Sequence, residues 1–159
     1  MRKAVVGAAL AALAVVLTAC GGGDDQGSGA TATTAVAQQA AEGTVAVAST
    51  GLGEVLVDAK GRTLYVFTKD KGDQSVCSGK CAAAWPALTV SGAATAGTGA
   101  QASLLSTAKQ ANGSTQVTYD GKPLYYFAGD TAAGDTKGQG LNGVWFVVRG
   151  DGSLVQSKG

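Results

Sequence analysis

Cys77 and Cys81 are the two side chains of this 159-residue chain with the greatest capacity for chemistry. Two thiols at this spacing can form a structural disulfide, act as a redox pair or give two thiolates to a metal. An oxidising compartment favours the disulfide. The pair does not fit the Cys-x-x-Cys motif of thiol oxidoreductases or the Cys-x-x-Cys-His motif of c-type haem attachment.

Asp70 and Asp130 are the carboxylates most suited to acid–base chemistry, provided that the fold brings them together. We favour a simpler interpretation, in which each aspartate accepts backbone N–H bonds in the turn after its strand. Asp130 and Asp135 lie close in a glycine-rich stretch, but the spacing is not that of an EF-hand. We therefore predict a solvated turn there and no metal site.

The sequence contains no histidine, and Met1 is its only methionine. This composition excludes Ser-His-Asp and Cys-His catalysis, imidazole metal sites and methionine-rich copper sites. A platform of aromatic side chains for a sugar, a quinone or electron transfer is a further possibility, although large aromatics in small β domains mostly form the core. We predict no cofactor. The aromatic candidates are Tyr65, Phe67, Trp85, Tyr125, Tyr126, Phe127 and Trp145.

An internal repeat organises these residues. The run from Gly61 to Asp70 matches the run from Gly121 to Asp130, and the offset is 60 throughout. The same offset relates Val45 to Leu105, Gly53 to Gly113, Val57 to Val117 and Trp85 to Trp145.

Each repeat has the pattern of a β-meander. Asn112-Gly113 separates 105–110 from 115–119, and Asp120-Gly121 leads into 124–127, as in β-hairpins. Gly51-Leu52-Gly53 and Asp58 to Gly61 occupy the matching places in the first repeat. A final hairpin is predicted around Asp151-Gly152. Only 80–85, ended by Pro86, indicates a helical turn.

Alternation predicts that Tyr65 and Phe67 share one face of their strand, with Leu64 and Val66 on the other. Because both faces are apolar, we expect this strand to be covered on both sides. The predicted fold class is all-β: two antiparallel β-meanders and a C-terminal hairpin, packed as a small sandwich or barrel. The repeats are expected at about 45–90 and 105–150.

The N-terminus indicates export. Arg2 and Lys3 precede an apolar run that ends in Leu-Thr-Ala before Cys20, which resembles a bacterial lipobox. We expect a lipoprotein signal peptide at 1–19, a lipidated Cys20, a flexible tether at 20–43 and one domain at 44–159. A lipid anchor holds a protein on a membrane without spanning it.

The charge balance excludes nucleic acid as a partner. Without Arg2 and Lys3, ten basic side chains face 11 acidic ones, and no basic block is present.

Several motifs together resemble a known family. Residues 65–70 and 125–130 fit a Tyr-x-(Phe/Trp/Tyr)-x-x-Asp signature, 77–81 are followed by Trp85-Pro86, and a Gly-Asp-x-x-Gly-x-Gly run at 134–140 precedes Trp145. The chain is similar over residues 54–152 to bacterial lipoproteins called "secreted repeat of unknown function". The resemblance implies an envelope location and leaves the role of the motif residues unknown: Tyr65, Phe67, Asp70, Trp85, Tyr125, Phe127, Asp130 and Trp145.

These observations predict a lipid-anchored protein on the extracytoplasmic face of the cell membrane. We expect a non-enzymatic binding or scaffolding module whose partner is an envelope protein or a small molecule. The alternative is a redox or electron-transfer lipoprotein that uses Cys77 and Cys81. A hydrolase would need Asp70 and Asp130 to converge at one pocket.

Overall fold

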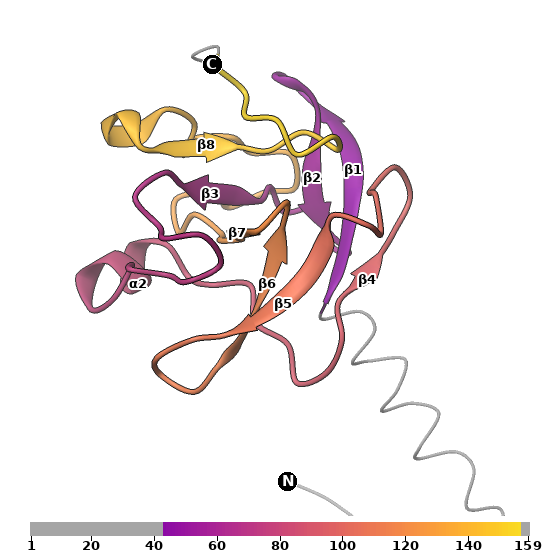
Figure 1. Ribbon diagram of the computed structural model, residues 1–159. Helices are drawn as coiled ribbons and strands as arrows, with labels where there is room; N and C mark the ends of the chain where they lie inside the picture. Colours follow the sequence, from indigo (N-terminus) through magenta and orange to yellow (C-terminus); the bar gives the residue numbers. More distant parts are fainter. Residues whose placement is uncertain (1–42, 157–159) are drawn as a thin grey trace, which may run out of the picture.

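Strands in three sheets make up most of the regular structure in the computed structural model, which describes residues 43–156 (Figure 1). The expected signal peptide, Cys20 and the tether up to residue 42 lie outside the described residues. The sheets have the strand orders β2-β1-β4, β3-β8 and β5-β6-β7. Within residues 43–156 they do not close into a barrel, and the fold is a small all-β sandwich. The elements are β1 (Thr44–Thr50), β2 (Gly53–Asp58), β3 (Tyr65–Phe67), α2 (Lys80–Ala84), β4 (Thr95–Ala96), β5 (Leu105–Lys109), β6 (Thr115–Tyr119), β7 (Lys122–Pro123), η1 (Leu141–Gly143) and β8 (Trp145–Val147).

The predicted hairpins are present in both repeats. β1 and β2 pair antiparallel from Val45 opposite Asp58 to Thr50 opposite Gly53. β5 and β6 pair in the same way around the Asn112-Gly113 turn. The predicted helical turn is α2, a single short helix.

The expected strand at 124–127 does not form a continuous ladder. Its backbone N–H groups are divided among separate segments: that of Leu124 donates to Val117, that of Tyr125 to Tyr65 and that of Tyr126 to Pro86. Because consecutive residues bond to different neighbours, two isolated bridges of Tyr125 remain in this stretch, and the strand β7 ends before it at Pro123. The C-terminal hairpin is also reduced, to a bridge between Val148 and Leu154 next to β8.

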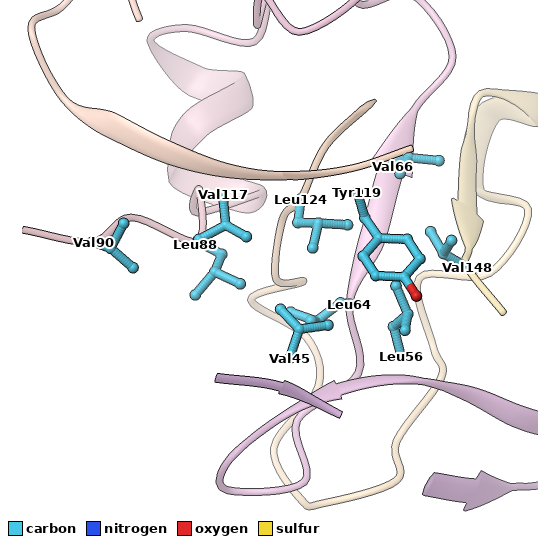
Figure 2. Packing of buried hydrophobic residues seen from close by; sticks show 10 residues of the cluster. All are labelled: Val45, Leu56, Leu64, Val66, Leu88, Val90, Val117, Tyr119, Leu124 and Val148. Carbon is cyan, nitrogen blue, oxygen red and sulfur yellow. The ribbon is translucent and has the colours of Figure 1, made fainter. Parts of the chain in front are cut away.

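β3 lies near the middle of the molecule, beside β8 (Figure 1). Its alternation divides the core as predicted: Leu64 and Val66 enter one cluster, and Tyr65 and Phe67 pack with the other. The aliphatic cluster, shown in Figure 2, comprises Val45, Leu56, Leu64, Val66, Leu88, Val90, Val117, Tyr119, Leu124 and Val148. The aromatic cluster comprises Val55, Val57, Tyr65, Trp85, Tyr125, Trp145, Val147 and Val155.

The second strands of the two repeats do not correspond at the offset of 60. The Leu64 N–H donates to the carbonyl of Leu56, whereas the Leu124 N–H donates to that of Val117. Leu56 and Val117 both belong to the aliphatic cluster, but Val57 belongs to the aromatic cluster. The predicted match of Val57 with Val117 is therefore wrong, and the counterpart of Val117 is Leu56.

Turn lengths explain this slip of one residue. The β1–β2 turn contains residues 51–52, whereas the Gln110–Ser114 backbone bond encloses 111–113. The following turn is shorter in the second repeat, with 59–61 in the first against 120–121 in the second. The two changes cancel, so the offset of 60 returns at Tyr65 and Tyr125. Between the two turns, the shift of one residue means that residues 60 positions apart point to opposite faces of their strands.

Candidate functional site

Each motif tyrosine is hydrogen-bonded to the motif aspartate of the other repeat. The Tyr65 hydroxyl donates to Oδ2 of Asp130 at 2.7 Å. The Tyr125 hydroxyl donates to Oδ2 of Asp70, also at 2.7 Å. The tyrosine and aspartate of one Tyr-x-Phe-x-x-Asp motif therefore do not bond to each other, and the two motifs form one reciprocal arrangement.

The second carboxylate oxygen of each aspartate holds the loop that follows its strand. Oδ1 of Asp70 accepts the N–H of Val76 at 2.9 Å, and Oδ1 of Asp130 accepts the N–H of Lys137 at 3.0 Å. Both carboxyls are partly buried, and this burial raises the pKa of Asp70 and of Asp130 above the ordinary value of 3.8. Hydrogen bonds to the carboxylates act against that rise.

Burial also raises the pKa of Tyr65 and of Tyr125, and the neighbouring aspartates add to the increase. Both phenols therefore remain protonated and act as donors at neutral pH. Oγ of Ser75 lies 2.6 Å from the Tyr125 hydroxyl, and the Gly138 N–H donates to that of Tyr65 at 3.2 Å.

Four of the candidate aromatics form a continuous stack in the order Phe67, Trp145, Trp85, Phe127. The two indoles at its centre are nearly parallel, with ring centroids 3.8 Å apart and an angle of 3°. Phe67 lies on Trp145 at 4.3 Å, and Phe127 lies on Trp85 at 4.5 Å. The indoles are buried, which leaves them a packing role.

Close contact with two aromatic rings explains why a glycine stands at position 138 in the Gly-Asp-x-x-Gly-x-Gly run. A Cβ at this position would lie 2.7 Å from Cη2 of Trp85 and 2.9 Å from Cε1 of Tyr65. Only glycine lets the loop approach the two rings so closely. In the same loop, Oδ2 of Asp135 accepts the N–H groups of Thr131 and Ala132, and Lys137 pairs with it. Asp135 therefore organises a solvated turn, and the hydrogen bonds that it accepts from Lys137, Thr131 and Ala132 lower its pKa to about 2.

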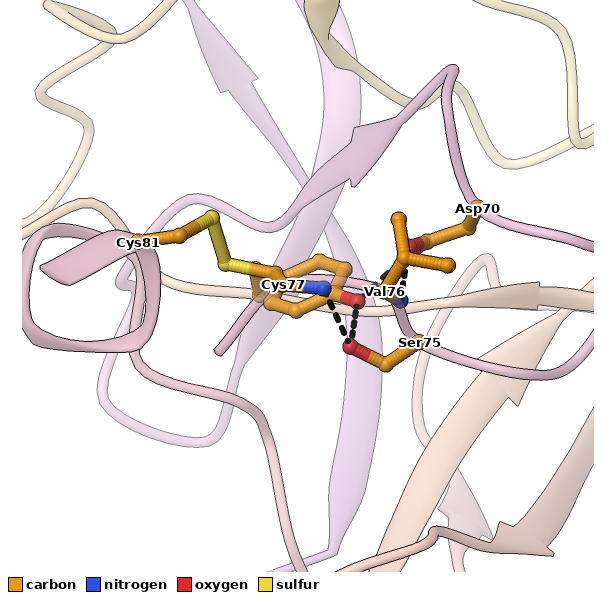
Figure 3. The surroundings of a disulfide bond; sticks show 6 residues. Asp70, Ser75, Val76, Cys77 and Cys81 are labelled. Atoms are coloured by element: carbon orange, nitrogen blue, oxygen red, sulfur yellow. Dashed lines mark hydrogen bonds between the residues drawn. A yellow bond between two sulfur atoms is a disulfide. The ribbon is translucent and has the colours of Figure 1, made fainter. Parts of the chain in front are cut away.

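Cys77 and Cys81 form a disulfide with a Cα–Cα distance of 5.3 Å (Figure 3). The bond joins the loop after β3 to the first turn of α2. Figure 3 also shows Ser75, which accepts the N–H of Cys77, and Asp70, which lies farther from the sulfur atoms next to Val76. Both cysteines are half-buried, and Cys77 lines a small hollow of about 160 Å³ with Ser78 and Trp85.

A larger hollow opens where the two repeats meet. This first hollow has a volume of about 390 Å³, and its apolar lining includes Phe67, Leu154 and the buried Val66. Asp70, Asp120 and Lys122 supply its charged groups. Asp130 lines a different hollow, so the fold does not bring the two motif aspartates to one pocket.

The sequence interpretation did not single out Val66, Lys122 or Leu154 as site residues. A usable signal was present in the repeat itself, because Val66 corresponds to Tyr126 in strands that otherwise match closely. A difference between matched repeats indicates a position whose side chain has a different role in each repeat.

Two further findings concern membranes and metals. In the part of the chain that the structure describes, no helix has the length and apolar character needed to cross a membrane. Among residues 43–156, the histidine, cysteine, aspartate and glutamate side chains form no group of three or more that could hold a metal ion.

Comparison with known proteins gives one match. A family model described as "secreted repeat of unknown function" matches the chain twice, at residues 46–89 and 106–149. The two matches begin 60 residues apart, in agreement with the repeat offset, and together they cover more than half of the chain. No curated protein and no solved structure matches. The chain therefore belongs to the family of secreted repeats of unknown function.

Proposed function

We propose that this protein is a membrane-anchored, extracytoplasmic and non-enzymatic binding module whose ligand is a small molecule. The observation that carries the proposal is the first hollow, which is lined by apolar residues that include Phe67 and Leu154 and by the charged residues Asp70, Asp120 and Lys122. Its volume of about 390 Å³ lies within the range of small-molecule sites, about 300–1,000 Å³. Membership of a secreted family is compatible with the extracytoplasmic location.

A small molecule is favoured over an envelope protein as the ligand. Protein-docking faces usually carry a contiguous apolar patch. Among the described residues, the only large hydrophobic side chains that are exposed are Val76 and Leu141. They are too few to form such a patch, whereas the first hollow is concave and lined with apolar groups.

A binding role is also favoured over hydrolysis. Both motif carboxylates accept a tyrosine hydroxyl and a backbone N–H, and they line different hollows. Two carboxylates can share acid and base roles only when they flank the same reacting bond.

The proposal is tested by thermal unfolding of the full-length chain in detergent with chemically distinct probes: a phenol, an alkanol, a sugar and a dipeptide. Binding to the native state raises the unfolding temperature, and the increase grows with the logarithm of ligand concentration once that concentration exceeds Kd. We expect at least one probe to stabilise the wild-type protein and to have little effect on Val66→Tyr, which fills the hollow. If every probe acts equally on both proteins, the first hollow is not a binding site.

A redox role for Cys77 and Cys81 is the second candidate. It is supported by the half-buried disulfide and by the small hollow that Cys77 lines beside Trp85. Equilibration of the protein with glutathione buffers measures its reduction potential. A value below about −300 mV is typical of structural disulfides and would contradict this candidate, whereas a much higher value would support it.

A further inference from the structure

The first hollow has a counterpart in the other repeat. The second hollow lies between the end of one Tyr-x-Phe strand and the basic residue that begins the other, as the first hollow does. Five positions of the first hollow correspond to five of the second at the offset of 60: Val66 to Tyr126, Phe67 to Phe127, Thr68 to Ala128, Asp70 to Asp130 and Lys122 to Arg62.

In the second hollow, the protein itself supplies an aromatic ring. The guanidinium carbon of Arg62 lies 3.9 Å from the centroid of the Tyr126 ring, a cation–π contact. The Tyr126 hydroxyl donates to Oδ2 of Asp58 at 3.1 Å, and Arg62 pairs with the same carboxylate. The space that remains there is about 180 Å³.

In the first hollow, the corresponding ring is missing. Val66 stands where Tyr126 stands in the other repeat, and the open volume is about 390 Å³, roughly twice as large. Lys122 takes the place of Arg62 and pairs with Asp120. Because of the one-residue slip, Tyr119 takes the place of Asp58, and its hydroxyl donates to the carbonyl of Gly150.

The first hollow therefore has a cation, apolar side chains and hydrogen-bond acceptors, as the second hollow does. It lacks the phenol ring that these groups contact in the second hollow. Lys122 is a part-exposed cation at the rim, and Val66, which is buried, adds no aromatic ring to the hollow. Asp70 and Asp120 line the same hollow, and each carboxylate oxygen can accept more than one hydrogen bond.

We propose that the first hollow binds a free small phenol, whose ring takes the place that the Tyr126 side chain occupies in the second hollow. The ring lies against Phe67 and Leu154 beneath Lys122, and its hydroxyl donates to a rim carboxylate. This inference rests on the proposed binding function and deepens it by naming the ligand class. The Tyr126 side chain shows the position that the ring of a bound phenol is expected to take.

The probe that tests this inference is p-cresol, because it has the same ring and hydroxyl as a tyrosine side chain. It is titrated into the ¹⁵N-labelled full-length chain in detergent, and backbone amide shifts are recorded. We expect saturable shifts at Thr68, Gly72 and Gly121, which line the first hollow. Toluene, which lacks the hydroxyl, should bind more weakly at the same residues.

Three variants locate the site. Val66→Tyr should abolish these shifts because the new ring fills the space. Lys122→Met should weaken p-cresol binding about two- to fivefold, the size of a cation–π contact at a part-exposed site. Tyr126→Val empties the second hollow and should create a second p-cresol site, with new shifts near Arg62 and Ala128.

The outcomes separate this inference from the proposed function. Failure of p-cresol to shift the lining residues, while another probe class still distinguishes the wild type from Val66→Tyr, overturns the phenol and leaves the binding function in place. Failure of every probe removes both. A tyrosine-containing peptide that binds the hollow in preference to p-cresol would point to a protein partner and would contradict a free phenol.

Discussion

Tyr65 and Tyr125 each donate the backbone N–H to the carbonyl oxygen of the other, at 2.9 Å in both directions. The two residues are equivalent in the repeat, so this bridge lies where the two halves are related by an approximate twofold axis. The side-chain bonds from Tyr65 to Asp130 and from Tyr125 to Asp70 follow the same symmetry. The centre of the molecule therefore consists of contacts between the repeats.

Removal of one motif aspartate should destabilise the fold. Asp130→Ala leaves the buried Tyr65 hydroxyl without its acceptor, which costs about 1–3 kcal/mol of unfolding free energy. Asp130→Asn retains an acceptor and should cost less. The measurement is urea unfolding, with Asp73→Ala as the control, because Asp73 is exposed and its loss should change stability by less than about 0.5 kcal/mol. Equal effects of Asp130→Ala and Asp73→Ala would contradict a structural role for the reciprocal bonds.

The loss of stability caused by replacing the motif aspartates with asparagine should depend on pH. Burial raises the pKa of Asp70 and of Asp130 in the native state, so the native protein binds protons more tightly than the unfolded chain. These carboxyls therefore favour folding below pH 3.8, and this contribution is lost as the pH rises through their raised values. The Asp70→Asn/Asp130→Asn variant lacks this pH-dependent contribution. Relative to the wild type, the variant should be less destabilised at pH 7 than at pH 3.5 in urea unfolding, and the opposite trend would contradict the assignment.

Gly138→Ala should disturb the aromatic cluster. The added methyl group would approach the rings of Trp85 and Tyr65 to less than 3 Å, and overpacking of this kind costs about 1–3 kcal/mol. Gly92→Ala is the matched control, because a Cβ at Gly92 meets nothing within 4 Å. Urea unfolding followed by tryptophan fluorescence measures both variants. Similar stabilities would show that the Gly138 loop can move away without cost.

Loss of the disulfide should weaken the protein without unfolding it. Cys77 and Cys81 enclose a very short loop, so a chain-entropy estimate gives about 2 kcal/mol of stabilisation. The second repeat has Lys137 and Leu141 at the matching positions and folds without such a bond. We expect Cys77→Ser/Cys81→Ser to lower the unfolding free energy by this amount in urea, and reductant should have no further effect on the variant. Complete loss of folded protein would mean that the bond is essential.

Replacement of Cys20 should release the protein from the membrane. The wild type should partition into the detergent phase and carry the mass of a diacylglyceryl group on Cys20, because a lipid anchor adds buried apolar surface. Cys20→Ala should lack that mass. Intact-protein mass spectrometry checks both, with Cys77→Ser/Cys81→Ser as a control that keeps the lipid. An unmodified Cys20 in the wild type would contradict the anchor.

Local sequence signals predicted much of the fold. The repeat, the Asn112-Gly113 hairpin, the short helix before Pro86 and the two apolar faces of β3 are all present, since each depends on neighbouring residues or on simple alternation. The slip between Val57 and Val117 could not be predicted in this way. It arises from two turns whose lengths change in opposite directions, so that the sequence offset on either side remains 60.

The candidate site was harder to predict because its contacts cross between the repeats. The Tyr-x-Phe-x-x-Asp spacing places Tyr65 and Asp70 in one motif, but their bonding partners come from the other. The first hollow has the same character, since Val66 and Lys122 belong to different repeats. Sequence proximity contains no information about such pairs, and only the arrangement of the two halves provides it.

The reciprocal bonding of Tyr65 to Asp130 and of Tyr125 to Asp70 has a consequence for ancestry. A polypeptide with a single copy of the motif would have an unpaired phenol and an unpaired carboxylate, and a second copy of itself could satisfy both as a homodimer. Duplication within one gene makes that association independent of concentration. It also frees matched positions to diverge, and Val66 with Tyr126, like Cys77 with Lys137, records that divergence.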